Sequence, residues 1–295
     1  GNPDRFVNQY EAVQLLFHPF MFTNPLLQPG QENVVNAWGV TNTFPKGVPG
    51  SFPVHTPDKI VVKDIEDWKD YVHAPSLKFT QDQWDMVKAQ YDAVDGEQAF
   101  KAAFVAPGLF ELTHHLCEIS NALVYYITNP DEMHDLIKYL TEWELELAEG
   151  ICSNLHPDAL FHHDDWGTQK STFISVDMFR EFFMDSYKRI YGYYHDHGVE
   201  LIIHHNDSYS ATLVPTMIEM GIDVWQGCMS VNDLPKLIKE YGKDITFMGG
   251  IDNGKVDRFD WNQEMIEEST DQLCRDCGKL YFIPCTTHGL NFSCI

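Results

Sequence analysis

A run of four polar residues, His204-His205-Asn206-Asp207, follows the short apolar segment Leu201-Ile202-Ile203. Imidazole nitrogens and carboxylate oxygens bind zinc, and the same groups act as general acids and bases. Because successive residues of a strand point to opposite faces, His205 and Asp207 can converge on one side while His204 faces the other. The alternate register would bring His204 and Asn206 inward instead. The run predicts a metal-binding or catalytic site. The alternative is that these residues pack in the core or cap a helix.

Cys285 stands just after another apolar segment, Leu280-Tyr281-Phe282-Ile283. Its thiolate would complete a set of three zinc ligands with His205 and Asp207, and such a set leaves an open position for substrate. The alternative is a buried free thiol, a common state of unpaired cysteine. We expect the metal ligands to come from His204, His205, Asp207 and Cys285.

A second polar run, His162-His163-Asp164-Asp165-Trp166-Gly167, follows the apolar residues 159–161. Asp164 or Asp165 could orient substrate, act as a general base, or hold a ligating histidine, and one of them could instead cap a helix. We expect Asp165 to be catalytic with His205 and Asp207, and His163 to contact substrate.

Three further segments contain residues that could bind a ligand or a metal. Asp252 follows Gly249-Gly250, and glycines allow close approach of a ligand, so Asp252 is expected to contact substrate. By contrast, His114-His115 is expected to pack against neighbouring elements. The CxxC sequence of Cys274 and Cys277 has no second pair and stands at the end of a predicted helix, so it is not expected to bind zinc.

The polar runs follow strand-like segments, and helical periodicity fills the stretches between them. This alternation predicts an α/β fold with a parallel sheet, as a (β/α)₈ (TIM) barrel, in which reactive groups gather where strands end. We expect one domain over residues 1–295, with an N-terminal loop region at 44–57 over the barrel mouth. Strands are expected at 13–17, 33–39, 104–106, 159–161, 201–203, 222–225, 245–248 and 280–283. Helices are expected at 64–72, 80–94, 129–152, 176–197 and from about 261 to 277.

The amino-acid composition limits the kinds of molecule that the protein is expected to bind. Lys and Arg total 20 against 44 Asp and Glu, a formal net charge of −24. Nucleic acid and anionic membranes are therefore not expected partners, because binding phosphate requires a cationic surface. The sequence shows no apolar run of about 18 residues and no signal-peptide pattern. Its 7 cysteines are odd in number and scattered, which favours a reducing, cytoplasmic location.

Several segments resemble the uroporphyrinogen decarboxylase superfamily, and the resemblance extends over most of the chain. The matching segments, in order, are Pro3-Asp4-Arg5, Ala37-Trp38-Gly39-Val40, Asp164 to Gln169, Met220-Gly221-Ile222-Asp223 and Gly249-Gly250-Ile251-Asp252. The resemblance implies a (β/α)₈ barrel. The true decarboxylases of this superfamily bind a polyanionic porphyrinogen through early arginines. This chain has only five arginines, none near residues 17–20, so that activity is not expected.

The other branch of the superfamily comprises corrinoid-dependent methyltransferases, which carry zinc on a His-x-Cys sequence and a distant Cys. Here His205-Asn206-Asp207 matches the first element, with Asp207 in place of Cys, and Cys285 matches the second. A carboxylate in place of a thiolate makes the site harder, which favours binding of an oxygen over activation of a thiol.

The resemblance therefore implies an O-demethylase-type methyltransferase that moves a methyl group from a methoxylated, aromatic substrate to the cobalt of a corrinoid protein. Trp38, Trp166 and Trp225 are expected to flank the aromatic ring. Three alternatives remain open at this point: transfer from a methyl-corrinoid to a thiol or folate, a decarboxylase-like lyase, and a barrel that binds without catalysis.

Overall fold

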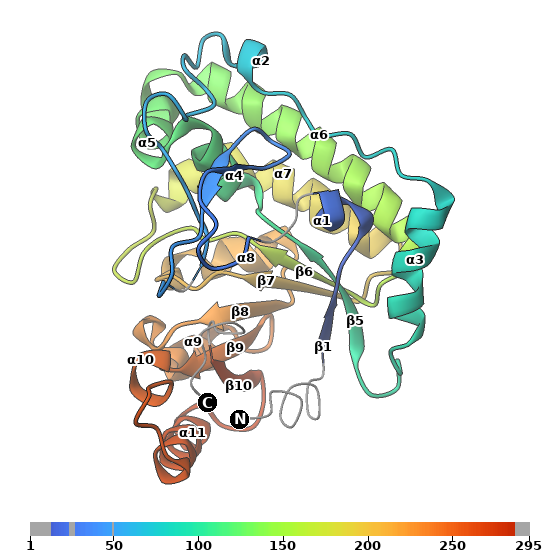
Figure 1. Cartoon of the computed structure of the whole chain (residues 1–295). Helices are drawn as coiled ribbons and strands as arrows, with labels where there is room; N and C mark the ends of the chain where they lie inside the picture. Colours follow the sequence, from blue (N-terminus) through green and yellow to red (C-terminus); the bar gives the residue numbers. More distant parts are fainter. Residues whose placement is uncertain (1–12, 24–26, 49, 287–295) are drawn as a thin grey trace.

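The computed structural model describes residues 13–23, 27–48 and 50–286. Within this part of the chain a curled sheet of seven parallel strands forms the centre of the molecule, in the order β1-β5-β6-β7-β8-β9-β10 (Figure 1). Their bounds are β1 Val13–Leu16, β5 Phe100–Val105, β6 Ala159–His163, β7 Leu201–His205, β8 Val224–Cys228, β9 Thr246–Ile251 and β10 Phe282–Thr286. The α/β fold with a parallel sheet is thus confirmed, and seven of the eight expected strands belong to this sheet.

The prediction that residues 33–39 form a strand of this sheet is wrong. Only β2 (Val34–Val35) forms there, and it pairs with β3 (Thr41–Thr43) in a separate antiparallel sheet completed by β4 (Phe52–Pro53). The physical reason is a tight reversal. The Asn36 carboxamide oxygen accepts hydrogen bonds from the main-chain N–H groups of Trp38 and Val40, and Gly39 has φ +81°. A side-chain oxygen that bonds nearby N–H groups favours a turn over a continuing strand.

Because β1 and β10 are the two ends of the strand order, a closed eightfold barrel is not confirmed for the described residues. The segment 44–57, expected as a loop, carries β4. The His55 Nε2 atom of this segment lies 3.1 Å from the main-chain oxygen of His115, so the segment contacts the helix that bears His115. Its position over a barrel mouth stays a prediction.

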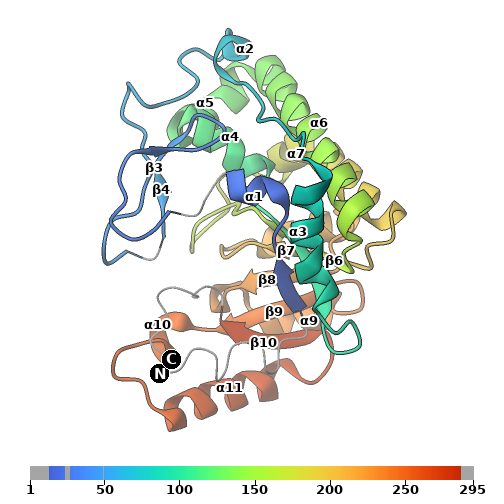
Figure 2. The same ribbon diagram turned by 45° about the vertical axis from the view of Figure 1, so that its right-hand side comes forward.

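Helices connect the strands and cover the sheet (Figure 2). Their bounds are α1 Pro19–Thr23, α2 Trp68–Tyr71, α3 Gln81–Asp92, α4 Leu109–Cys117, α5 Ile119–Thr128, α6 Pro130–Leu155, α7 Val176–Asp196, α8 Val214–Met220, α9 Leu234–Tyr241, α10 Asn253–Val256 and α11 Gln263–Cys277. Short 3₁₀ turns occupy Ala211–Leu213 and Ser230–Asn232. None of the helices in the described part of the chain is both long and apolar enough to span a bilayer.

Local signals explain where the main helices begin and end. Thr80 and Gln83 form a reciprocal capping box at the start of α3, and the Ser175 hydroxyl accepts the main-chain N–H of Met178 at the start of α7. Gly278 follows α11 with φ +82°, a conformation that glycine adopts without steric cost. The predicted helices at 80–94, 129–152 and 176–197 correspond to α3, α6 and α7.

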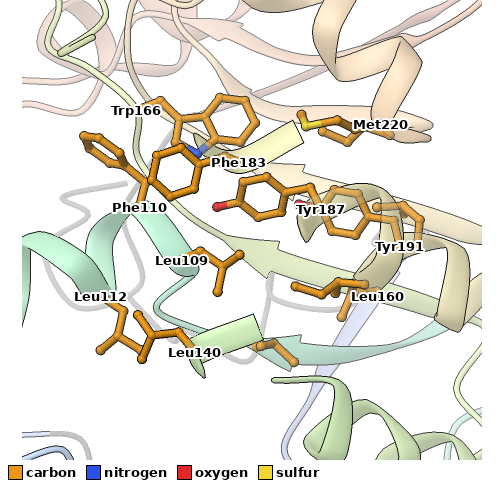
Figure 3. Close-up of a cluster of buried hydrophobic side chains, with 14 of the residues drawn as sticks. Leu109, Phe110, Leu112, Leu140, Leu160, Trp166, Phe183, Tyr187, Tyr191 and Met220 are labelled. Carbon is orange, nitrogen blue, oxygen red and sulfur yellow. The ribbon is translucent and has the colours of Figure 1, made fainter. Parts of the chain in front are cut away.

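Two apolar clusters lie on the two faces of the sheet. The larger one packs α6 and α7 against the sheet, and its members include Leu160, Phe183, Tyr187 and Tyr191 (Figure 3). The smaller cluster fills the concave face with Ala102, Ala159, Phe161, Ile203 and Val224. Since residues alternate along a strand, Phe161 and Ile203 place the side chains two positions later, His163 and His205, on this same inner face.

Candidate functional site

The carboxyl ends of β6 and β7 bring two histidine pairs side by side. The strands are parallel and in register, with His162 opposite His204 and His163 opposite His205. The rings of His163 and His205 stack with their centroids 4.4 Å apart and their planes at 17°. The first of the two registers considered for residues 204–207 is therefore the one observed: His205 lies on the inner face, and His204 on the outer face.

Asp165 joins the inner pair to form a group suited to a metal ion. One ligand atom from each of His163, Asp165 and His205 lies within 4.8 Å of the other two. The Nε2 atom of His205 is 4.0 Å from a carboxylate oxygen of Asp165. That same oxygen accepts the main-chain N–H of Asp207 at 2.8 Å, which holds the Asp165 side chain in place. Two imidazoles and a carboxylate are ligands that zinc accepts, so this group fits the expected ion.

Glu111, in the first turn of α4, pairs with His163. Its Oε2 atom lies 2.9 Å from His163 Nδ1. Burial lowers the pKa of His163, but the Glu111 carboxylate raises it more, to about 10. Burial raises the pKa of Glu111 to about 7 against the opposing effect of His163. A carboxylate that holds one nitrogen of an imidazole orients the other nitrogen, as in carboxylate–histidine–metal arrangements.

Asp207 lies beside Asp165 at the same strand ends. Burial, followed by the charge of Asp165, raises the pKa of Asp207 to about 7. Two carboxylates held this close do not ionise independently, because each charge disfavours the other. The inner face therefore concentrates acidic groups around the two stacked imidazoles.

Gln226 connects His205 with Cys285. The Gln226 Oε1 atom contacts Nδ1 of His205, and its Nε2 atom lies 3.8 Å from the Cys285 sulfur. Burial raises the pKa of the Cys285 thiol to about 11. Cys285 and His205 thus line the same end of the sheet, with one amide side chain between them. Within the part of the chain that the structure describes, the ligand atoms of His205, Asp207 and Cys285 do not all lie within 4.8 Å of one another.

His204, also expected among the metal ligands, lies apart from the inner group. Its side chain is fully buried on the outer face, and its ring stacks on Trp166 with the centroids 4.0 Å apart. The Tyr191 hydroxyl lies 3.0 Å from His204 Nδ1 and 2.9 Å from His162 Nδ1. The alternation of side chains along β7 separates His204 from the inner group.

Asp164 fixes the start of α4 and so the position of Glu111. Its carboxylate oxygens accept the main-chain N–H groups of Phe110 and Glu111 at 3.2 and 2.8 Å, and the Trp166 indole N–H at 2.8 Å. An acidic side chain at a helix N-terminus satisfies N–H groups that have no partner in the helix. A Cβ atom on Gly108 would lie 2.5 Å from the Asp164 Cβ, so this approach requires glycine.

The three tryptophans and Asp252, which were expected to contact substrate, contact neighbouring residues of the protein. Trp38 and Trp166 are only 4% and 1% exposed, and Trp225 is fully buried with its indole N–H on the main-chain oxygen of Asn206. Trp38 packs edge-on against Trp143, and Trp166 lies in the core cluster (Figure 3). Trp38 and Trp143 also line a small pocket together with His18 and Phe20. The Asp252 carboxylate accepts the main-chain N–H of Gly254 as the N-cap of α10.

Three residues of this region escaped the sequence reasoning. Glu111 and Gln226 each contact a histidine of the inner group, and Glu144 places Oε1 2.8 Å from Nε2 of the buried His162. For Glu111 a signal was available: Glu111, His114 and His115 have helical i, i+3 and i+4 spacing, which puts all three on one helix face. Gln226 and Glu144 carried no such signal.

The chain belongs to the uroporphyrinogen decarboxylase (URO-D) family, whose model matches residues 34–293. No curated protein sequence matches the chain significantly. Among solved structures, a methyltransferase from Methanosarcina mazei is similar, with a TM-score of 0.63 at 12% identity over 91% of this chain and 75% of that one. At that identity the likeness shows the fold. The apo form of 3-keto-D-glucoside 4-epimerase, YcjR, from E. coli has a TM-score of 0.38 at 10% identity, over 72% of this chain and 80% of that one, and it carries no argument.

Proposed function

We propose that the protein is a corrinoid-dependent methyltransferase of the O-demethylase type. It would move a methyl group from a methoxylated aromatic substrate to the reduced cobalt of a corrinoid carried by a partner protein. The observation that carries the proposal is the inner group of His163, Asp165 and His205 at the carboxyl ends of β6 and β7. Reactive groups of parallel α/β enzymes gather at that end of the sheet. Membership of the URO-D family and the methyltransferase neighbour support the same chemistry.

The distribution of arginine favours methyl transfer over porphyrinogen decarboxylation. All four arginines in the described residues pair with nearby carboxylates away from the strand ends: Arg180 with Glu219, Arg189 with Glu142, Arg258 with Asp260 and Arg275 with Asp271. The inner face instead presents acidic groups. A substrate with several carboxylates would meet repulsion there, whereas a neutral methoxyarene would not.

His163, Asp165 and His205 would hold zinc, with Cys285 as a further candidate ligand beyond Gln226. When bound, zinc would act as a Lewis acid toward the ether oxygen. The residues of the chain have their own parts in the reaction. Glu111 orients His163, and Gln226 orients His205. As the carbon–oxygen bond breaks, the methyl group would go to cobalt and the electron pair would stay on the phenolate oxygen, to which Asp207, whose pKa is raised to about 7, can supply a proton.

The test is a direct assay of the methyl acceptor. The purified chain is incubated with chemically reduced cobalamin, in place of the corrinoid protein, and with a panel of methoxyarenes, while the cobalt(I) absorbance is followed. We expect loss of cobalt(I) with at least one methoxyarene and release of the matching phenol. His205→Gln, Asp207→Ala and Cys285→Ser should each slow this reaction. Cys274→Ser, a half-buried cysteine on α11, is the matched control.

Other outcomes select the alternatives. Methyl transfer from methylcobalamin to a thiol or a folate, without any methoxyarene reaction, would reverse the proposed direction. Binding of a methoxyarene that all three variants retain, without turnover, would identify a non-catalytic binding protein. Full activity in chelator-treated protein with no zinc by elemental analysis would remove zinc from the site but leave the methyl transfer in place.

A further inference from the structure

A second group of potential metal ligands lies on α4, outside the inner group. Glu111, His114 and His115 each offer one ligand atom, and these atoms all lie within 4.8 Å of one another. Their spacing places the three side chains on one face of the helix. The rings of His114 and His115 are perpendicular, with centroids 4.8 Å apart.

Burial favours the neutral form of both histidines of this group. Burial, together with neighbouring histidines, lowers the pKa of His114 to about 4 and the pKa of His115 well below its usual range. A neutral imidazole offers a nitrogen lone pair for coordination of a metal ion.

A third imidazole is held beside this pair. The His55 Nε2 atom lies 3.1 Å from the main-chain oxygen of His115, so its N–H group donates to that oxygen. From the sequence, His114-His115 was expected only to pack against neighbouring elements. Such packing does not require a third histidine and a carboxylate at the same place.

We infer that Glu111, His114 and His115 bind a divalent first-row transition metal ion. Two imidazoles and one carboxylate suit zinc, cobalt(II), nickel(II) or iron(II) better than magnesium or calcium. Glu111 also contacts Nδ1 of His163 at 2.9 Å, so its carboxylate lies between this group and the inner group. The protein would then hold two cations joined through one carboxylate. This inference does not depend on the methyl-transfer reaction.

The test counts bound metal. Tag-free protein is stripped with a chelator, loaded with zinc sulfate, desalted and measured by elemental analysis. The wild-type chain should retain two equivalents, one for each group. The double variant His114→Gln/His115→Gln should retain one, and so should His205→Gln, because each removes a different group. Glu111 is left unchanged because it contacts both groups.

The control tests for casual binding by exposed histidines. His195 and His197 are both exposed near the end of α7, and the double variant His195→Gln/His197→Gln should retain two equivalents. A second measurement is the rise in thermal midpoint on adding zinc, which should be smaller in the single variant His114→Gln than in wild type. That single change on a half-buried helix face keeps the test valid if the double variant does not fold.

The possible results separate this inference from the proposed function. Equal zinc content in the wild-type protein and in the variant His114→Gln/His115→Gln would overturn the inference. One equivalent in wild type that is lost in His205→Gln would overturn it too, while leaving zinc in the inner group. Protein that retains no zinc at all would exclude both zinc sites, but not methyl transfer.

Discussion

At the scale of single residues, two similar histidine pairs serve opposite faces of the sheet. His163 and His205 point to the inner face and stack on one another, whereas His162 and His204 point outward and share the Tyr191 hydroxyl. Burial lowers the pKa of His162, but Glu144 raises it overall, whereas burial keeps the pKa of His204 well below its usual range. These directions assign His162 Nδ1–H as a donor to the tyrosine oxygen, and the tyrosine O–H as a donor to His204.

Replacing Tyr191 should therefore destabilise the protein through two unsatisfied histidines. Tyr191→Phe removes the hydroxyl between His162 and His204 and should lower the free energy of unfolding by about 1–3 kcal/mol. Tyr194→Phe is the matched control on the same helix. The Tyr194 hydroxyl is buried without a hydrogen-bond partner among the described residues, so its removal should be neutral or slightly stabilising. Urea unfolding of both variants measures this, and equal losses would contradict the assigned hydrogen bonds.

At the scale of elements, the positions of β5, β6 and α4 decide whether Glu111 reaches His163. The main-chain N–H of Gly108 donates to the main-chain oxygen of His163 at 2.7 Å, which ties the start of α4 to the end of β6. The Asp164 carboxylate then receives the first N–H groups of the helix. A helix begun in this way presents its first turn to the inner face of the sheet, and Glu111 belongs to that turn.

Gly108→Ala should break this junction. The added Cβ would lie 2.5 Å from the Asp164 Cβ and 2.8 Å from the His162 ring, so the helix start must shift, and we expect a loss of about 1–3 kcal/mol in unfolding free energy. Gly192→Ala is the control, because a Cβ at this position within α7 meets nothing within 4 Å. It should stabilise by about 0.5–1 kcal/mol through helix propensity. Similar urea midpoints for the two variants would count against the steric argument.

At the scale of the whole molecule, acidic charge dominates. The formal net charge of −24 is spread over 295 residues, and repulsion among like charges opposes the compact state. The acidic groups gathered at the strand ends add to this repulsion locally.

Salt should accordingly stabilise the protein. Raising sodium chloride from about 0.01 to 0.3 M shortens the Debye length from about 30 Å to under 10 Å, so the thermal midpoint should rise by several degrees. The rise should level off beyond that concentration, since screening is then nearly complete. Differential scanning calorimetry measures the midpoint. A midpoint that falls with salt would show that attractive ion pairs, not net repulsion, dominate the electrostatic free energy.

Much of the architecture could be predicted from the sequence, since strand and helix periodicity reflects which faces are buried. Seven of eight strands, the caps at Thr80 and Gly278, and the membership of the URO-D family all follow from local patterns. The expected strand at 33–39 failed because the Asn36 side chain and Gly39 favour a reversal that periodicity does not register. The burial of Trp38, Trp166 and Trp225 depends on packing, which the sequence pattern does not show.

The sequence by itself determined that polar residues follow the strands and that His205 and Asp207 share a side opposite to His204, because alternation along a strand is local geometry. Only the tertiary structure decided which register held, and that His163 and Asp165 form a group of potential metal ligands with His205. It also decided that Glu111 from α4 and Gln226 from β8 reach the two histidines. These contacts join residues far apart in the chain, and their distances depend on how the strands and helices pack, which no local pattern encodes.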